Sequence, residues 1–324
     1  MIKMERNVSL DLLRIFACLT VIMIHTAGSP IVHGLVEIGT LEYDECLILE
    51  ALSRWSVPVF AMLTGFFMLD STKDISIKTI FSKYILRLFI SLVFWSAFYA
   101  VTLHKSFYPL GCQEGHFWYV GMCIGLYLAL PIMRLVASNT RVLAYFCWTW
   151  LAIKMYQFLG VYFRLPVDLR DIIFVDYVGY CLFAYYLKVI YINKFVRKIF
   201  YIVGILSLVI TIIAGLFTKN CDTAFYGYTA PNVIIFAISL FIFFLYHPIK
   251  NNNIIAKKIS IVSQCTFGIY MVHLWILIQI FFRFYRFVPY IIPLCLICVC
   301  VTFFIALGMT YVIRKIPYVG RYIV

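Results

Sequence analysis

The sequence predicts an all-α integral membrane protein, and two properties of its composition lead to that prediction. Of the 324 residues, 64% are apolar and 13% are charged, against roughly 45–50% and 25% in soluble domains. The mean hydropathy of +0.98 leaves too few charged side chains to cover a water-facing surface. The composition therefore excludes a soluble enzyme, a disordered chain and a nucleic-acid-binding domain.

Ten apolar segments have the length of a bilayer-crossing helix, which needs about 20 residues. They are residues 9–27, 47–69, 80–103, 117–136, 142–160, 172–190, 199–217, 230–247, 261–282 and 290–313. The first segment is interrupted by Asp11 and Arg14 and is followed by nine others, so we interpret it as a retained helix and not a signal peptide.

The distribution of positive charge predicts the orientation. With the N-terminus inside, most of the 27 Lys and Arg residues fall on inner connections, as the positive-inside rule requires. Both termini are then cytoplasmic, and the net charge of +13 faces anionic membrane lipids and not nucleic acid. All connections are short, so residues 1–324 form a single bundle of about ten transmembrane helices.

The first predicted helix carries ionisable residues, which are costly inside a membrane and by default mark a functional site. Asp11 lies one turn from Arg14 and can pair with it. His25 follows Arg14 by eleven positions, about three turns, so both side chains point the same way about 16 Å apart. Either this helix face is functional, or the ion pair anchors the helix end while His25 reaches the outer interface.

Three further spans contain polar candidates. In the second span Glu50 and Arg54 are spaced to pair on one helix face, as a structural ion pair or as a substrate contact. The outer end of the fourth span contains His116, Trp118 and Tyr119, which fit either an interfacial aromatic belt or an aromatic wall for a sugar ring. The ninth span carries a histidine near mid-membrane, and an imidazole there needs a partner or a wet cavity. That residue is His273.

Two other features have mainly structural interpretations. Lys154 in the fifth span and Asp176 in the sixth can form an ion pair between adjacent helices. The 11 Cys residues show no paired metal-ligand spacing, so no metal site is predicted. Three of them fall in or near predicted outer connections and leave a disulfide open: Cys46, Cys112 and Cys221.

Five segments together resemble the membrane-bound acyltransferase-3 family. Residues 9–25 contain the family's Arg, ten intervening residues and His. Residues 57–67 resemble its Pro-x-Phe-Phe-x-(Leu/Met)-Ser-Gly-(Phe/Tyr)-Phe segment, and 83–87 resemble the basic segment that follows. Residues 116–119 and 269–273 are similar to two later motifs. The short chain without an appended domain resembles the surface-polysaccharide O-acetyltransferases.

This resemblance implies acyl transfer in the bacterial cytoplasmic membrane. The donor is acetyl-CoA, used as a substrate with no permanently bound cofactor, and the acceptor is a hydroxyl of a carbohydrate or lipid-linked glycan. His25 acts as general base or transient acyl carrier, and Arg14 positions the donor. Four basic residues meet the donor phosphates: Lys73, Lys78, Lys83 and Arg87. The acceptor or supporting candidates are Asp11, Glu50, Arg54, His116, Trp118, Tyr119 and His273.

Two other classes of function remain open from the sequence. A transporter or flippase for a polar lipid or solute would use the same intramembrane charges as its pathway. A membrane sensor or scaffold would use them only as structural ion pairs. The sequence leaves the acceptor sugar, the acyl group, the choice between direct transfer and an acyl-enzyme, and the oligomeric state open.

Overall fold

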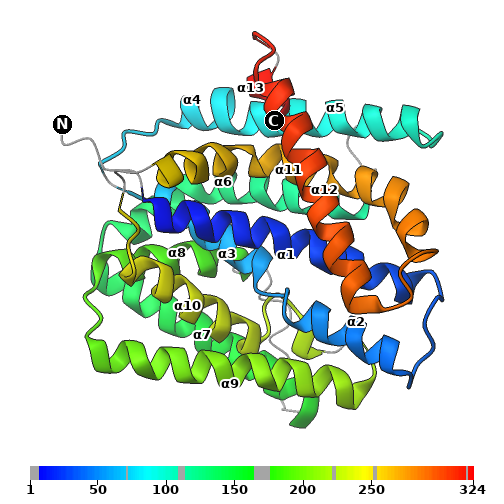
Figure 1. The fold of residues 1–324 in the computed structure, drawn as a ribbon. Helices are drawn as coiled ribbons and strands as arrows, with labels where there is room; N and C mark the ends of the chain where they lie inside the picture. The colour runs from blue at the N-terminus through cyan, green and yellow to red at the C-terminus, as the bar shows by residue number, and fades with distance from the viewer. Residues whose placement is uncertain are drawn as a thin grey trace.

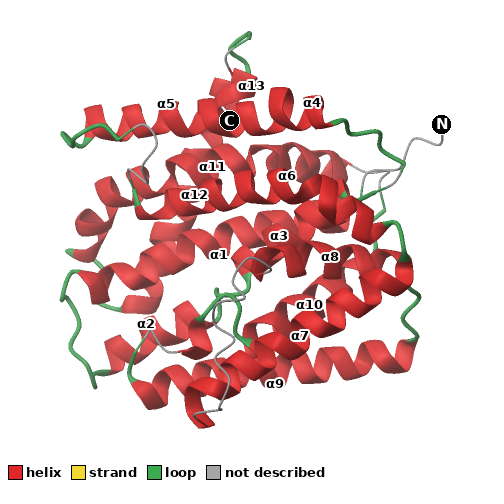
Figure 2. Cartoon of the chain, turned by 180° about the vertical axis from the view of Figure 1, so that it is seen from behind, coloured by secondary structure: helices red, strands yellow, loops and turns green. Residues whose placement is uncertain are grey.

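The structure is a computed structural model that describes residues 7–70, 72–108, 114–163, 176–220, 224–250, 254–318 and 320–324. These residues form helices and connections, and no strand occurs among them (Figure 2). The long helices are α1 Val8–Val32, α5 Leu86–Thr102, α6 Trp118–Ala137, α7 Thr140–Phe163, α8 Asp176–Val189, α9 Lys194–Thr218, α10 Pro231–Tyr246, α11 Ile254–Tyr285 and α12 Ile291–Arg314. Shorter elements are α2 Leu41–Ala51, α3 Ser56–Met68, α4 Ile77–Thr79 and α13 Gly320–Ile323.

Eight candidate membrane-spanning helices are present in the described part of the chain, where the sequence predicts about ten. The two further predicted spans, 142–160 and 172–190, correspond to α7 and α8. Helix α7 carries Lys154 and Gln157, which reduce its hydropathy. Residues 172–175 of the other predicted span lie outside the described residues, and the described helix α8 has 14 residues. The all-helical class is confirmed, while the orientation of the termini stays a prediction.

Helix α1 lies at the centre of the bundle (Figure 1) and packs against α2, α3, α10, α11 and α12. It begins at Val8 because the side chain of Asn7 accepts a hydrogen bond from the Leu10 amide and caps the helix. In both views α5 runs along one edge of the bundle and α9 along the opposite edge. The residues of α1 are therefore surrounded by protein on most sides.

The second predicted span is two helices, α2 and α3, separated by a turn at residues 52–55. Pro58 lies in the first turn of α3, where proline is tolerated because the first amide groups have no partner within the helix. The turn is held by its own side chains: Ser53 donates to the Leu49 carbonyl at 2.8 Å and the Trp55 indole donates to the Leu52 carbonyl at 2.8 Å. The third predicted span is also irregular, with a π-helical turn at Ile80–Ile85 between α4 and α5.

Two apolar clusters divide the interior. One is built mainly by α3, α6, α7, α8 and α10, and the other by α1, α5, α6, α11 and α12. Helices α3 and α8 approach closely at Gly65, where a Cβ would overlap the backbone of Cys181. Only glycine fits at that crossing.

Ion pairs and arginine hydrogen bonds join different elements of the bundle. The predicted pair between Lys154 of α7 and Asp176 of α8 is confirmed. Asp70, which follows α3, pairs with Lys188 of α8 at 2.6 Å. Arg134 of α6 donates to the carbonyls of Met68, Asp70 and Lys73 at 2.9, 3.2 and 2.6 Å. The connection after α3 is thus fixed by cations from two other helices.

Gly65→Ala should lower the stability of the folded protein by about 1–3 kcal/mol, because the added methyl group forces α3 and α8 apart. Gly125→Ala in α6 is the matched control, since open space surrounds that position and the change is neutral or slightly stabilising in a helix. The measurement is the thermal unfolding midpoint of each variant in the same detergent. Equal midpoints would contradict the close α3–α8 approach.

The Asp70–Lys188 pair should make stability depend on acid pH. Burial alone would raise the pKa of the Asp70 carboxyl, but hydrogen bonds from Lys188 and Thr72 outweigh it and lower the pKa from 3.8 to about 2. The stabilisation is therefore present above pH 3.8 and is lost as the pH falls through about 2, an effect of about 2 kcal/mol. The difference in thermal midpoint between wild type and Asp70→Asn should shrink over that range. A difference independent of pH would show that the carboxylate charge contributes nothing.

Candidate active site

Three histidines from distant parts of the chain meet in the bundle. They are His25 of α1, His116 of the short 3₁₀ helix Gly115–Phe117 and His273 of α11. The ring centroid of His25 lies 5.1 Å from that of His273 and 6.1 Å from that of His116, and the latter two are 5.1 Å apart. His116 and His273 are buried, while His25 is half-buried. We call these residues the histidine cluster.

The hydrogen bonds of the cluster indicate which nitrogens are free. His273 Nδ1 lies 2.5 Å from the Tyr270 carbonyl, and because a carbonyl only accepts, Nδ1 carries the proton. Nε2 of the neutral ring is then an acceptor, and it has no partner among the described residues. The ring of His116 hydrogen-bonds to the backbone of Met271. Buried polar atoms are almost always paired, so the unpaired Nε2 of His273 beside His25 indicates a place for a polar group.

Tyrosines hold the histidine cluster in place. The Tyr270 hydroxyl donates to the His116 carbonyl, which joins α11 to the segment before α6. The Tyr99 hydroxyl donates to the Met271 carbonyl at 3.1 Å and accepts from the Trp275 amide at 2.9 Å. These bonds fix α5, α11 and the His116 segment relative to one another.

Arg14 lies about three turns before His25 on α1, in a separate polar group. The predicted ion pair with Asp11 is present, with 3.5 Å between Arg14 Nη1 and Asp11 Oδ1. Ser263 of α11 bridges the pair: its hydroxyl donates to Asp11 Oδ1 at 2.7 Å and accepts from Arg14 at 3.3 Å. Ser260 donates to the other carboxylate oxygen at 3.3 Å. The guanidinium of Arg14 also lies over the ring of Phe67, 5.5 Å from its centroid.

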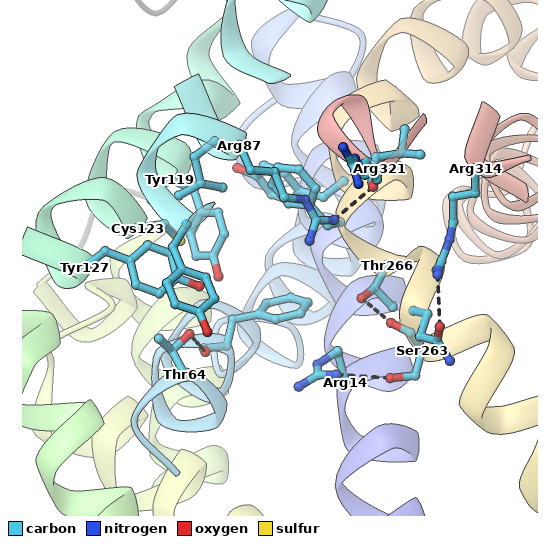
Figure 3. A pocket seen from close by; sticks show the side chains of 17 residues that line it. Arg14, Thr64, Arg87, Tyr119, Cys123, Tyr127, Ser263, Thr266, Arg314 and Arg321 are labelled. Carbon is cyan, nitrogen blue, oxygen red and sulfur yellow. Dashed lines mark hydrogen bonds between the residues drawn. The ribbon is translucent and has the colours of Figure 1, made fainter. Parts of the chain in front are cut away.

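A cavity of about 610 Å³ begins beside Arg14 (Figure 3), and its lining includes residues of both apolar clusters. Its cationic lining residues are Arg14, Arg87, Arg314 and Arg321, and its tyrosines are Tyr84, Tyr119, Tyr127 and Tyr270. His25 does not line it. Tyr270 lies between the cavity and the histidine cluster, and the ring of Tyr119 packs against it with 5.0 Å between the centroids. Tyr270 contacts both sides, since its ring also lies 5.5 Å from that of His273.

The four basic residues predicted to meet a donor lie in different surroundings. Arg87 lines the cavity. Lys78 and Lys83 are exposed and do not line it. Lys73 donates to the Phe67 carbonyl at 2.7 Å, so its ammonium group is engaged with the end of α3. Arg314 and Arg321 line the cavity instead. In the sequence, nothing distinguishes these two residues from the other Lys and Arg residues predicted to lie on the cytoplasmic side.

The Glu50–Arg54 ion pair predicted for the second span is confirmed. A Cβ on Gly28, one turn after His25, would lie 3.0 Å from the Glu50 carboxylate, so the pair borders the histidine cluster. The Arg54 guanidinium lies over the rings of Tyr226 and Tyr228, 5.2 and 5.7 Å from their centroids.

Trp118 and Tyr119 face different parts of the protein. Trp118 is 36% exposed and stacks on Tyr228 at 5.8 Å, whereas Tyr119 is buried against the cavity. The sequence does not identify Tyr226 and Tyr228 as residues near the site, because no motif or helical spacing distinguishes them from the other tyrosines.

Neither the cysteines nor a set of metal ligands adds a further site within the described residues. Cys46 is buried and free, while Cys112 and Cys221 lie outside the described residues, so the disulfide that the sequence leaves open is not tested. No group of three or more His, Cys, Asp or Glu residues in the described ranges could hold a metal ion.

The comparison with protein families decides the identity. The family model described as "Acyltransferase domain" (acyltransferase-3) matches residues 7–310. The chain belongs to the acyltransferase-3 family. Arg14, His25, His116 and His273 lie within the matched region, and the eight apolar helices together with this family indicate a multi-pass membrane acyltransferase. Searches of curated proteins and of solved structures found no significant match.

Asp11→Ala should destabilise this acyltransferase by about 2–3 kcal/mol, because it leaves the Arg14 cation without its carboxylate partner in a low-dielectric interior. Asp74→Ala is the matched control, since Asp74 is exposed. Thermal unfolding of both variants in nanodiscs measures the effect. Similar midpoints for the two variants would show that the Asp11–Arg14 pair does not contribute to stability.

Proposed function

We propose that the protein transfers an acetyl group from acetyl-CoA to a hydroxyl of a carbohydrate or lipid-linked glycan. The observation that carries this proposal is the arginine-lined cavity that lies one residue, Tyr270, away from the histidine cluster. Polyanionic donors bind arginines because the guanidinium fork matches phosphate oxygens. An imidazole has a nitrogen that can take a proton from a hydroxyl or attack a thioester carbon.

In this proposal the donor occupies the cavity with its phosphates at the arginines and its thioester toward Tyr119 and Tyr270. Arg14 positions the donor along the cavity. Because Tyr270 lies between the cavity and the histidine cluster, the pantetheine arm has to pass it to reach the imidazole. An extended arm can cover the roughly 16 Å between Arg14 and His25 along α1.

His25 acts as the general base in the direct route. Its free nitrogen takes the proton of the acceptor hydroxyl as the hydroxyl oxygen attacks the thioester carbonyl carbon. The carbon–sulfur bond breaks, and the CoA thiolate leaves and takes up a proton. In the two-step route the His25 nitrogen attacks first, releases CoA, and the acetyl-imidazole is then cleaved by the hydroxyl. His273 supports either route because its Nε2 acceptor can hold one N–H of His25 in a fixed direction.

The acceptor binds in this proposal on the other side of His25. Glu50 and Arg54 border that side, and the exposed ring of Trp118 stacks with Tyr228. Aromatic faces with adjacent charged hydrogen-bonding groups suit a sugar ring, because its C–H face packs on the ring while its hydroxyls bind the charged groups.

The test uses purified protein in nanodiscs with radiolabelled acetyl-CoA and a panel of oligosaccharides. Wild type should transfer label. His25→Ala should bind acetyl-CoA yet lose transfer by about 10²–10⁴-fold, and Arg14→Ala should weaken donor binding. His33→Ala is the matched control, because His33 is exposed at the end of the same helix.

Each outcome has a definite meaning. Covalent label after acid quenching that requires His25 would favour the two-step route. Transfer by His25→Ala at the wild-type rate would overturn the role of His25. Absence of acetyl-CoA binding by wild type would favour the transporter alternative, since a transporter has no need of the thioester.

A further inference from the structure

The segment after the family match, residues 311–324, supplies part of the cavity wall. The family match ends at residue 310, and Arg314, Arg321 and Val324 all line the cavity. Two of the four cavity arginines therefore come from a segment that the family model does not cover. We call residues 311–324 the C-terminal segment.

The C-terminal segment is held against the bundle by specific bonds. Ser91 and Trp95 of α5 donate to the Ile323 carbonyl at 2.8 and 3.0 Å, and Arg87 donates to a backbone oxygen of Val324 at 2.9 Å. A Cβ on Gly320 would overlap the Ile313 carbonyl, so the chain turns tightly back on α12. These contacts place α13 beside α5 (Figure 1).

The cavity has a strongly positive lining. No Asp or Glu is among its lining residues within the described chain. Arg14 and Arg87 are half-buried, whereas Arg314 and Arg321 are exposed at the rim. Figure 3 shows Arg87, Arg314 and Arg321 around the same opening. A cluster of four guanidinium groups with no Asp or Glu side chain among the described lining residues attracts a polyanion.

The two rim arginines keep hydrogen-bonding capacity for a ligand. Arg314 donates to the Gln264 side-chain oxygen at 2.9 Å and to Cys265 Sγ at 3.8 Å, which directs its guanidinium along α11. Arg321 lies over the ring of Tyr322, 4.9 Å from the centroid. Since a guanidinium has five N–H donors, both side chains retain donors for phosphate oxygens.

We propose that Arg314 and Arg321 bind the phosphate groups of the acyl donor and make the enzyme specific for a nucleotide-bearing thioester. The inference rests on the proposed function and identifies which part of the donor is recognised, and by which residues. Arg14 and Arg87 lie deeper and meet the part of the donor nearer the thioester. The C-terminal segment thus serves as a specificity element at the rim of the cavity.

The experiment compares three donors that share the same thioester: acetyl-CoA, acetyl-dephospho-CoA and S-acetylpantetheine, which carries no phosphate. The variants are Arg314→Gln, Arg321→Gln and the double variant, with the exposed Arg141→Gln of α7 as matched control. The KM for acetyl-CoA should rise about tenfold per arginine removed, with kcat nearly unchanged. The KM for S-acetylpantetheine should not change.

Salt gives a second readout, because exposed charges are screened by ions. The wild-type KM for acetyl-CoA should rise with ionic strength more steeply than that of the double variant. A salt dependence equal in wild type and the double variant would count against phosphate binding at these arginines.

Four results would overturn the proposal. If the double variant raises the KM of all donors equally, the arginines only support the fold. If their effect on KM appears in phosphatidylglycerol nanodiscs and disappears in phosphatidylcholine nanodiscs, they bind lipid headgroups. If wild type uses S-acetylpantetheine as well as acetyl-CoA, the acyltransferase function stands and phosphate recognition fails, whereas use of no donor overturns both.

Discussion

The cost of placing charge in an apolar bundle is the constraint on which this structure depends. Asp11 and Arg14 are tolerated in the central helix because they neutralise each other and because Ser263 of α11 bridges them. That bridge fixes the rotation of α1 against α11, and the same rotation directs His25 and His273 toward each other three turns further along. An ion pair at one end of a helix therefore determines the geometry of the imidazoles at the other.

Tyr270 connects the two polar regions of the site. It lines the arginine-lined cavity together with Tyr119, its hydroxyl donates to the His116 carbonyl, and its ring lies 5.5 Å from that of His273. Under the proposed function a donor in the cavity and a hydroxyl beside His25 approach Tyr270 from opposite sides, so only a narrow thioester arm has to pass it.

The sequence predicted those features that follow from periodicity, and it missed those that depend on packing. The Asp11–Arg14 and Glu50–Arg54 relations follow from the fixed repeat of a helix, and both ion pairs are present. The approach of His116 and His273 to His25 to within about 5–6 Å depends on how α1, α11 and the His116 segment pack, which spacing along the chain does not encode. For the same reason the lysines of the inner connections and the rim arginines Arg314 and Arg321 look alike in the sequence. The broken second span also differs from the single helix that hydropathy suggests.

The break between α2 and α3 lets one stretch of chain contribute to two places. Glu50 and Arg54 lie at or just before the break and border His25, while Phe60 and Thr64 lie after it and line the cavity. Each half is shorter than a full crossing, and the turn at 52–55 is fixed both by its own hydrogen bonds and by rings of other segments, Phe236 against Trp55 and Tyr226 under Arg54. The turn therefore acts as a fixed joint, so that the position of the cavity wall on α3 is tied to that of the charged groups beside His25.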